Sequence, residues 1–163
     1  MPPETDNLLL QELYQADQKD REKVYDTAAS VAGLKKNAAK RRGLVGEMMS
    51  QGQVNTANDL YHAGVIFLHG EEPKDFLTAH RLATLAAIMG HKPARWLTAA
   101  SLDRFLVTMG QPQIYGTQFE HNGEENRYQL RLPLDDSNVL SFEKRYLNVP
   151  AVMDRLIQLN RRI

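Results

Sequence analysis

The sequence predicts one mainly α-helical domain that closes with a β-hairpin and two short helices. Apolar residues recur at helical spacing before Gly110, prolines and glycines divide that stretch into helix-sized pieces, and an alternating pattern follows. The length of 163 residues lies in the usual range of a single domain. We therefore predict a single domain over 1–163, with a helical part over 6–110, a β-hairpin over 113–132 and C-terminal helices over 137–162.

The first predicted helix spans residues 6–30 and is capped by Thr5 or Asp6, directly after two prolines. Gly33 is expected to break the helix, and a second helix is predicted over residues 34–50. The helical spacing of the first helix is carried by Leu9, Leu10, Leu13, Ala16, Val24, Ala28 and Val31.

Three further helices are predicted over residues 56–68, 73–89 and 93–109. Proline opens the last two of them and glycine follows each end, which is the expected asymmetry of helix boundaries. The fourth and fifth helices are apolar around most of their circumference, so we expect them to be central. The boundary residues are His69, Gly70, Pro73, Gly90, Pro93 and Gly110.

A weak internal repeat relates the third helix to the fifth. A shift of 37 residues places Ala57, Leu60, Ala63 and Gly64 on Ala94, Leu97, Ala100 and Ser101. Small residues at these intervals let neighbouring helices pack closely. The stretch resembles a Sel1-like member of the tetratricopeptide class, whose repeats bind partners. The alternative is that the repeat serves only as a scaffold.

The β-hairpin is predicted from residues 113–119, which favour a strand, and from residues 128–132, which alternate apolar with polar. A turn over 121–124 joins them. A short helix capped by Asp136 or Ser137 is then predicted over 139–147, and a last one begins at Pro150.

The composition restricts the class of protein. The chain has no cysteine, which fits a reducing cytoplasm. Its 20 basic and 20 acidic residues give a formal net charge of zero, which disfavours a nucleic-acid partner because dedicated DNA-binding domains are usually basic. No apolar stretch is long enough to cross a bilayer, and the acidic start differs from a signal peptide. We therefore expect a soluble cytoplasmic protein with no membrane partner and no cofactor.

The densest polar segment begins in the second half of the predicted fifth helix and continues beyond its end. Asp103 and Arg104 lie among apolar neighbours there, and a buried charge needs a partner because desolvation costs several kcal/mol. Side chains that donate and accept hydrogen bonds follow downstream, namely Gln113, Tyr115, Thr117 and Gln118.

A second polar group lies in the first helix. Asp17 and Arg21 are four residues apart and therefore share one helix face, with Gln18 beside them. The two groups carry complementary charges, so we expect Asp17 to meet Arg104, or Asp103 to meet Arg21.

Three sequence blocks carry a family resemblance, namely Asp17-Gln18-x-x-Arg21, Asp103-Arg104 and Gly110-Gln-Pro-Gln-x-Tyr-Gly-Thr-Gln118. Together with Leu132-Pro-Leu-Asp-Asp136, they resemble a bacterial family of domains of unknown function. The resemblance spans most of the chain and is strongest over residues 102–119. It implies a bacterial protein and marks positions of interest, but that family carries no established activity.

These observations lead to the hypothesis of a binding or interaction module, with a protein or a small polar ligand as its partner. The polar pocket would lie between the first helix, the fifth helix and the hairpin. One alternative is a purely structural network that ties the hairpin to the helices. A second is a hydrolase-like enzyme that uses Asp17 or Asp103 as acid or base, and a third is a partner-binding helical repeat.

Two other groups of side chains favour weaker hypotheses. His62 and His69 are seven residues apart on one helix, whereas helical zinc ligands are typically four apart, so we predict no metal site. The basic cluster has no interleaved aromatic residues for base stacking and indicates a solvated helix face. It comprises Lys35, Lys36, Lys40, Arg41 and Arg42.

Overall fold

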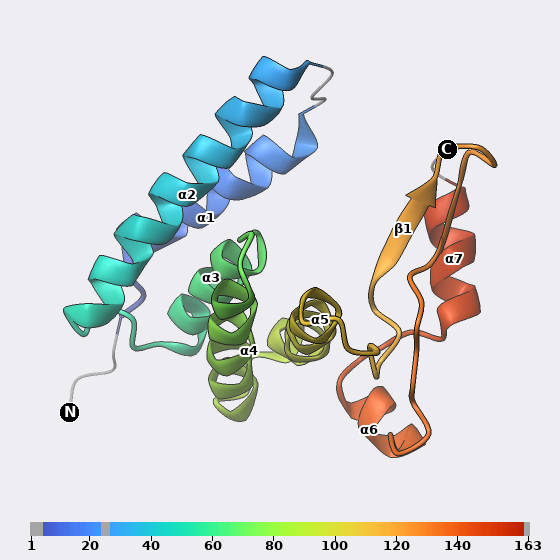
Figure 1. The fold of residues 1–163 in the computed structure, drawn as a ribbon. Helices are drawn as coiled ribbons and strands as arrows, with labels where there is room; N and C mark the ends of the chain where they lie inside the picture. Colours follow the sequence, from blue (N-terminus) through green and yellow to red (C-terminus); the bar gives the residue numbers. More distant parts are fainter. Residues whose placement is uncertain (1–4, 24–26, 162–163) are drawn as a thin grey trace.

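The computed structural model describes residues 5–23 and 27–161, and within these ranges it contains seven helices and one two-stranded antiparallel sheet (Figure 1). The predicted mainly helical class with a β-hairpin is confirmed. The elements are α1 (Leu8–Glu22), α2 (Ala28–Ser50), α3 (Ala57–Leu68), α4 (Pro73–Ile88), α5 (Lys92–Thr108), β1 (Phe119–Asn122), β2 (Arg127–Leu130), α6 (Ser141–Tyr146) and α7 (Val152–Asn160).

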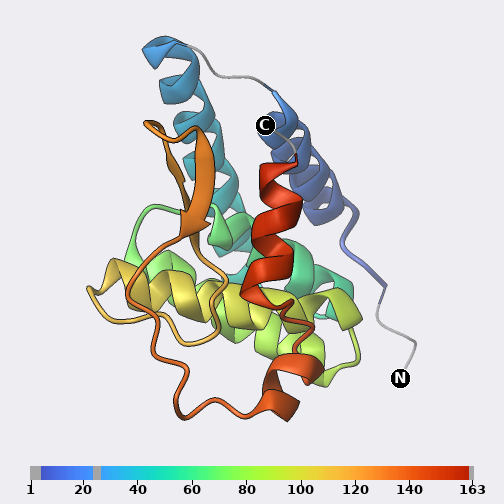
Figure 2. The same cartoon turned by 90° about the vertical axis from the view of Figure 1, so that its right-hand side faces the viewer.

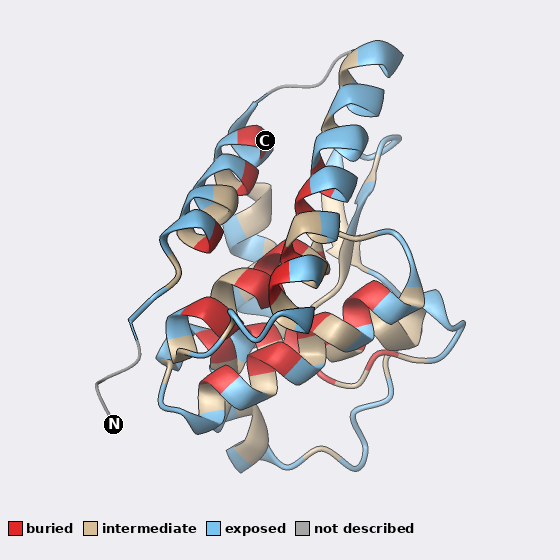
Figure 3. Ribbon diagram, turned by 90° about the vertical axis from the view of Figure 1, so that its left-hand side faces the viewer, coloured by how far each residue is buried: buried red, intermediate tan, exposed pale blue. Residues whose placement is uncertain are grey.

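The helices α3, α4 and α5 form the centre of the molecule. Figure 1 shows α1 and α2 on one side of this centre and the β-hairpin with α7 on the other, and in Figure 2 the hairpin and α7 face the viewer. The two clusters of buried apolar residues come from α1 to α5, Tyr115 in the loop after α5 is also buried, and neither α6 nor α7 contributes a buried residue (Figure 3). None of the helices in the described ranges combines the length and apolar character needed to cross a membrane.

Most positions of the internal repeat lie in the core, and Ala57 is only partly buried. Leu60 and Ala63 on α3 and Leu97 and Ala100 on α5 are all buried. A Cβ atom at Gly64 would lie 3.2 Å from Leu97 Cδ2, so this close approach favours a small residue. The packed helical pairs are therefore observed, while the resemblance to Sel1-like repeats stays a prediction.

The boundary between the first two helices was predicted wrongly. Helix α1 ends at Glu22 and α2 begins at Ala28, so residues 6–30 do not form one helix. Thr27 and Ser30 form a capping box that starts α2, and the helix continues through Gly33, because one internal glycine costs only about 1 kcal/mol. The expected apolar position 24 lies outside the described residues.

Two further details of the helices differ from the prediction. Asn7, rather than Thr5 or Asp6, caps α1, and its Oδ1 accepts a hydrogen bond of 3.1 Å from Leu10 N. Helix α4 is not surrounded on all sides, because Leu85 and Ile88 are exposed. The predicted ends of α3, α4 and α5 agree with the structure within one or two residues.

The β-hairpin is shorter than predicted. Residues 119–122 pair with 127–130, whereas residues 113–118 form a loop against the end of α5. The loop does not become a strand because Asp103 binds its backbone N–H groups. Helix α6 begins after Leu140 with no side-chain cap, so the predicted caps Asp136 and Ser137 were wrong.

Candidate functional site

Asp17 lies at the centre of a buried polar cluster that joins α1, α2 and the end of α3. Its Oδ2 lies 2.6 Å from His69 Nδ1 and accepts a hydrogen bond of 3.3 Å from Gln18 Nε2. Its Oδ1 faces Arg41 Nη2 at 3.5 Å and Arg21 Nη2 at 3.8 Å. The side chain of Asp17 is fully buried; its Oδ2 is hydrogen-bonded, while its Oδ1 has only the two arginine charges nearby and accepts no hydrogen bond from the described residues.

Arg41 extends this cluster to Asp20, one helical turn after Asp17. Arg41 Nη2 lies 2.8 Å from Asp20 Oδ2, and Lys23 Nζ lies 2.7 Å from Asp20 Oδ1. Hydrogen bonds from Lys23 and Arg41 lower the pKa of Asp20 below its ordinary value. The sequence interpretation had assigned Arg41 to a solvated helix face, but the structure buries it as the link between α1 and α2.

Asp103 is the second buried carboxylate, and it holds the loop over residues 113–118. Its Oδ1 accepts hydrogen bonds from Ile114 N at 2.8 Å and Tyr115 N at 3.0 Å. Its Oδ2 accepts from Thr117 N at 2.9 Å and Thr117 Oγ1 at 2.7 Å. Asp103 therefore has four donors and fixes the start of the hairpin on α5.

Two glutamines complete this network. Gln113 is fully buried; its Nε2 donates to Gln118 O at 3.1 Å and to Arg131 O, and its Oε1 accepts from Gln118 N at 2.9 Å. Gln118 Nε2 donates to Ala100 O at 3.1 Å. These bonds hold the first residues of the hairpin against α5.

Tyr115 connects the same loop to α6. Its hydroxyl donates a hydrogen bond to Glu143. Burial and this bond raise the pKa of Tyr115 above its ordinary value. The adjacent Gly116 has φ +77°, and a Cβ there would lie 2.9 Å from Val152 Cγ2 on α7. The Tyr-Gly-Thr segment thus serves as a junction between α5, α6 and α7.

Neither of the charge pairs expected from the sequence forms. Asp17 is bound by His69 and two arginines of α1 and α2, and Asp103 is bound by backbone and hydroxyl donors. Asp103 is fully hydrogen-bonded by its own loop, and Asp17 is paired within α1, α2 and the end of α3, although no described residue donates a hydrogen bond to its Oδ1. Neither carboxylate therefore pairs with Arg104.

Arg104 projects from α5 toward the space between the two polar clusters. Its Nη1 donates to Leu68 O at 2.9 Å, its Nε donates to Gln118 Oε1 at 3.2 Å, and its guanidinium lies 5.8 Å from the centre of the Phe76 ring. No carboxylate in the described part of the chain forms an ion pair with Arg104. Its partners are therefore two neutral oxygens and a ring, and its charge is uncompensated.

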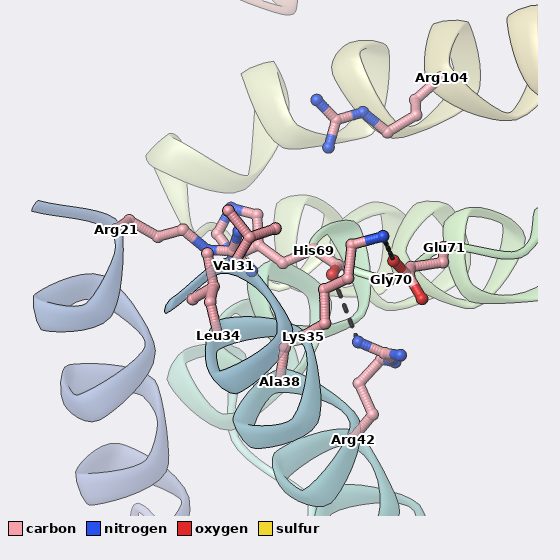
Figure 4. Close-up of a pocket in the computed structure, with 10 residues that line it drawn as sticks. All are labelled: Arg21, Val31, Leu34, Lys35, Ala38, Arg42, His69, Gly70, Glu71 and Arg104. Carbon is pink, nitrogen blue, oxygen red and sulfur yellow. Dashed lines mark hydrogen bonds and ion pairs between the residues drawn. The ribbon is translucent and has the colours of Figure 1, made fainter. Parts of the chain in front are cut away.

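A cavity of about 200 Å³ lies beside Arg104, between α1, α2 and the α3–α4 connection. We call it the helix-side cavity. In Figure 4 the guanidinium groups of Arg21 and Arg104 reach toward it from opposite walls. It is lined by Arg21, Val31, Leu34, Lys35, Ala38, Arg42, His69, Gly70, Glu71 and Arg104.

A second cavity of about 350 Å³, the hairpin-side cavity, adjoins the first. The two share Gly70, Glu71 and Arg104, so together they form one cleft. Arg131, the residue after β2, lines the second cavity. Burial lowers the pKa of Arg104, and the nearby charges of Arg21 and Arg131 lower it further.

The connection between α3 and α4 shapes the floor of the cleft. Asp75 Oδ2 accepts hydrogen bonds from Glu71 N at 3.1 Å and Glu72 N at 3.3 Å. A Cβ atom at Gly70 would lie only 2.3 Å from Asp75 Cβ, so glycine is required there. Glu71 is then paired with Lys35 at 2.7 Å, so its charge is already compensated within the cleft.

The structure divides the predicted site residues into two groups. Arg21, Arg104 and Gln118 line the cleft. The others do not line either cavity and belong to the buried networks; they are Asp17, Gln18, Asp103, Gln113, Tyr115 and Thr117.

The sequence reasoning missed Lys35 and Arg42 as cleft residues, although it recognised their basic cluster. It also missed Arg131, for which no sequence signal was available because the position only becomes relevant once the hairpin packs near α5. Over residues 5–23 and 27–161, no three histidine, aspartate or glutamate side chains converge as metal ligands would.

Comparisons with family models, with curated proteins and with solved structures return no match for this chain.

Proposed function

We propose that this protein is a cytoplasmic bacterial binding module whose cleft takes a small anionic ligand. The observation that carries the proposal is the half-buried Arg104, which has no carboxylate partner among the described residues and faces a cavity with Arg21 on its opposite side. A charge removed from water in this way favours a ligand of opposite charge. The proposal keeps the predicted pocket between the first helix, the fifth helix and the hairpin, and adds α2 as a wall.

The charges around the cleft support an anion rather than a cation. Four basic side chains and one glutamate line the helix-side cavity. Lys35 is paired with Glu71 and Arg42 with Asp75, which leaves Arg21 and Arg104 as the charges that can meet a ligand. Arg21 shares the single carboxylate of Asp17 with Arg41, at distances of 3.8 and 3.5 Å. A ligand with carboxylate or phosphate oxygens would receive charge-assisted hydrogen bonds from guanidinium groups.

The arrangement of the two buried carboxylates weighs against the hydrolase-like alternative. A general acid or base must come within hydrogen-bond reach of its substrate. Asp17 and Asp103 are fully buried, and Asp103 accepts four hydrogen bonds from its own loop. We therefore propose that these two residues stabilise the structure around the cleft and do not act as acid or base.

Isothermal titration calorimetry at low ionic strength tests the proposal, with inorganic phosphate, sulfate and acetate as probes. We expect saturable binding of at least one probe that weakens as salt is added, since screening reduces the attraction. Arg104→Gln is expected to weaken the binding of the probe about tenfold or more, because one charge-assisted hydrogen bond is lost.

Two further variants keep the test independent of folding defects. Arg21→Gln removes a more exposed cleft charge and should also weaken binding, while Arg81→Gln removes the charge of an exposed arginine on α4 that lines neither cavity. The melting temperature of each free variant is measured alongside. Absence of saturable binding for every probe, or equal weakening by Arg81→Gln, would refute the proposal.

A further inference from the structure

We infer that the cleft recognises a ligand with two anionic groups, one held between Arg21 and Arg104 and the other between Arg104 and Arg131. This inference rests on the proposed function and goes beyond it by specifying the ligand class. The shared chemistry is that of a molecule with two carboxylate or phosphoryl groups at a short separation.

The first argument is the position of Arg104 in the middle of the cleft. It lines both cavities, with Arg21 at the far wall of one and Arg131 at the wall of the other. Both outer arginines act electrostatically on Arg104. The three like charges repel one another, so an anion in each interval would relieve the repulsion on both sides of Arg104.

The second argument is the lack of internal compensation on the hairpin side. Arg131 is exposed, and no described carboxylate forms an ion pair with it. Among the residues that the structure describes, Glu71 is the one carboxylate that lines the hairpin-side cavity, and it is paired with Lys35 at 2.7 Å. Arg104 and Arg131, which have no ion-pair partner among the described residues, therefore face this second cavity. The first cavity is faced by Arg104 and by Arg21, which shares Asp17 with Arg41.

The third argument is size. The helix-side cavity of about 200 Å³ is smaller than the range of about 300–1,000 Å³ that is usual for small-molecule sites. It has room for one anionic group but not for a larger ligand. The hairpin-side cavity of about 350 Å³ brings the joined cleft into the usual range, with Phe76, Val107 and Phe119 as apolar wall.

Calorimetric titration of the full chain tests the inference with probes that carry one or two anionic groups. Inorganic phosphate and acetate carry one; pyrophosphate and the series succinate, glutarate and adipate carry two. We expect at least one two-group probe to bind about tenfold tighter than its one-group counterpart, because linking the groups makes the second contact intramolecular. The phosphate and carboxylate arms identify which chemistry the cleft prefers.

The variant Arg131→Gln tests whether the second anionic group binds between Arg104 and Arg131. It should remove the advantage of the two-group probes and weaken the one-group probes much less, because these can still bind between Arg21 and Arg104. Arg127→Gln is the matched control, because it removes an arginine of the same hairpin that lines neither cavity of the cleft. An equal loss in both variants would overturn the assignment, as would an unchanged advantage in Arg131→Gln.

The outcomes separate this inference from the proposed function. If one-group probes bind and two-group probes bind no tighter, the inference fails while the anion-binding function stands. If no probe of either kind binds, both fail together.

Discussion

Replacement of Asp103 is the substitution whose effect on stability follows most directly from the structure. The carboxylate is fully buried and accepts three backbone N–H bonds and one hydroxyl bond from the loop over residues 113–118. Hydrogen bonds to a charged group contribute about 1.5–3 kcal/mol each, and an unsatisfied buried donor costs about 1–3 kcal/mol. Water that enters the space left by the carboxylate recovers part of this loss.

We therefore expect Asp103→Ala to lower the free energy of unfolding by about 3–5 kcal/mol, the size typical of a broken buried network. Asp103→Asn should cost less, about 2–4 kcal/mol, because one oxygen still accepts while the amide nitrogen faces a donor. Thr117→Val removes two hydrogen bonds of the hydroxyl, one to Asp103 at 2.7 Å and one from Gln118 at 3.1 Å, but keeps the backbone bonds to Asp103, and should cost about 1 kcal/mol.

Urea unfolding followed by far-ultraviolet circular dichroism measures these differences by linear extrapolation. The expected order of destabilisation is Asp103→Ala, then Asp103→Asn, then Thr117→Val. If Asp103→Ala costs no more than Thr117→Val, then Asp103 does not hold the loop and the description of a structural carboxylate is wrong.

Three further predictions concern stability. Gly116→Ala should lower the free energy of unfolding in urea by about 1–2 kcal/mol, because φ +77° is left-handed and the new Cβ would lie 2.9 Å from Val152 Cγ2. Gly123→Ala, which has open space around it, should change the free energy little, and equal effects of the two substitutions would contradict this reasoning. Burial lowers the pKa of His62, so the unfolded chain takes up its proton first, and stability should fall as the pH drops from about 7.5 to about 5.5, less so in His62→Gln. A His62→Gln variant with the same pH dependence as the natural chain would speak against that cause. Arg41→Ala leaves the two buried aspartates of α1 without their shared arginine and should lower the free energy of unfolding by about 3–5 kcal/mol, while a loss below about 1 kcal/mol would mean that the cluster contributes little.

The helical part could be predicted wherever proline and glycine mark the boundaries. The ends of α3, α4 and α5 follow from Pro73, Pro93 and the glycines after each helix, two of which have positive φ. The first boundary failed because a capping box at Thr27 is a weaker sequence signal than the glycine six residues later.

The candidate site could be predicted only in part, because its charges pair across tertiary contacts. The sequence indicates that Asp17 and Asp103 need partners, but it does not reveal that His69 and the backbone of the 113–118 loop supply them. Residues 113–118 have strand propensity, yet their N–H groups bind a buried carboxylate instead of a neighbouring strand. The tertiary partner overrides the local preference at this point.

The measurement that tests the anion cleft most directly is nitrogen–proton correlation NMR of the arginine Nε–H groups during titration with phosphate. The account predicts that the Arg104 signal moves saturably, together with that of Arg21, while the signal of Arg81 stays in place. A stationary Arg104 signal, or linear shifts of all arginines of the kind that ionic strength produces, would contradict it.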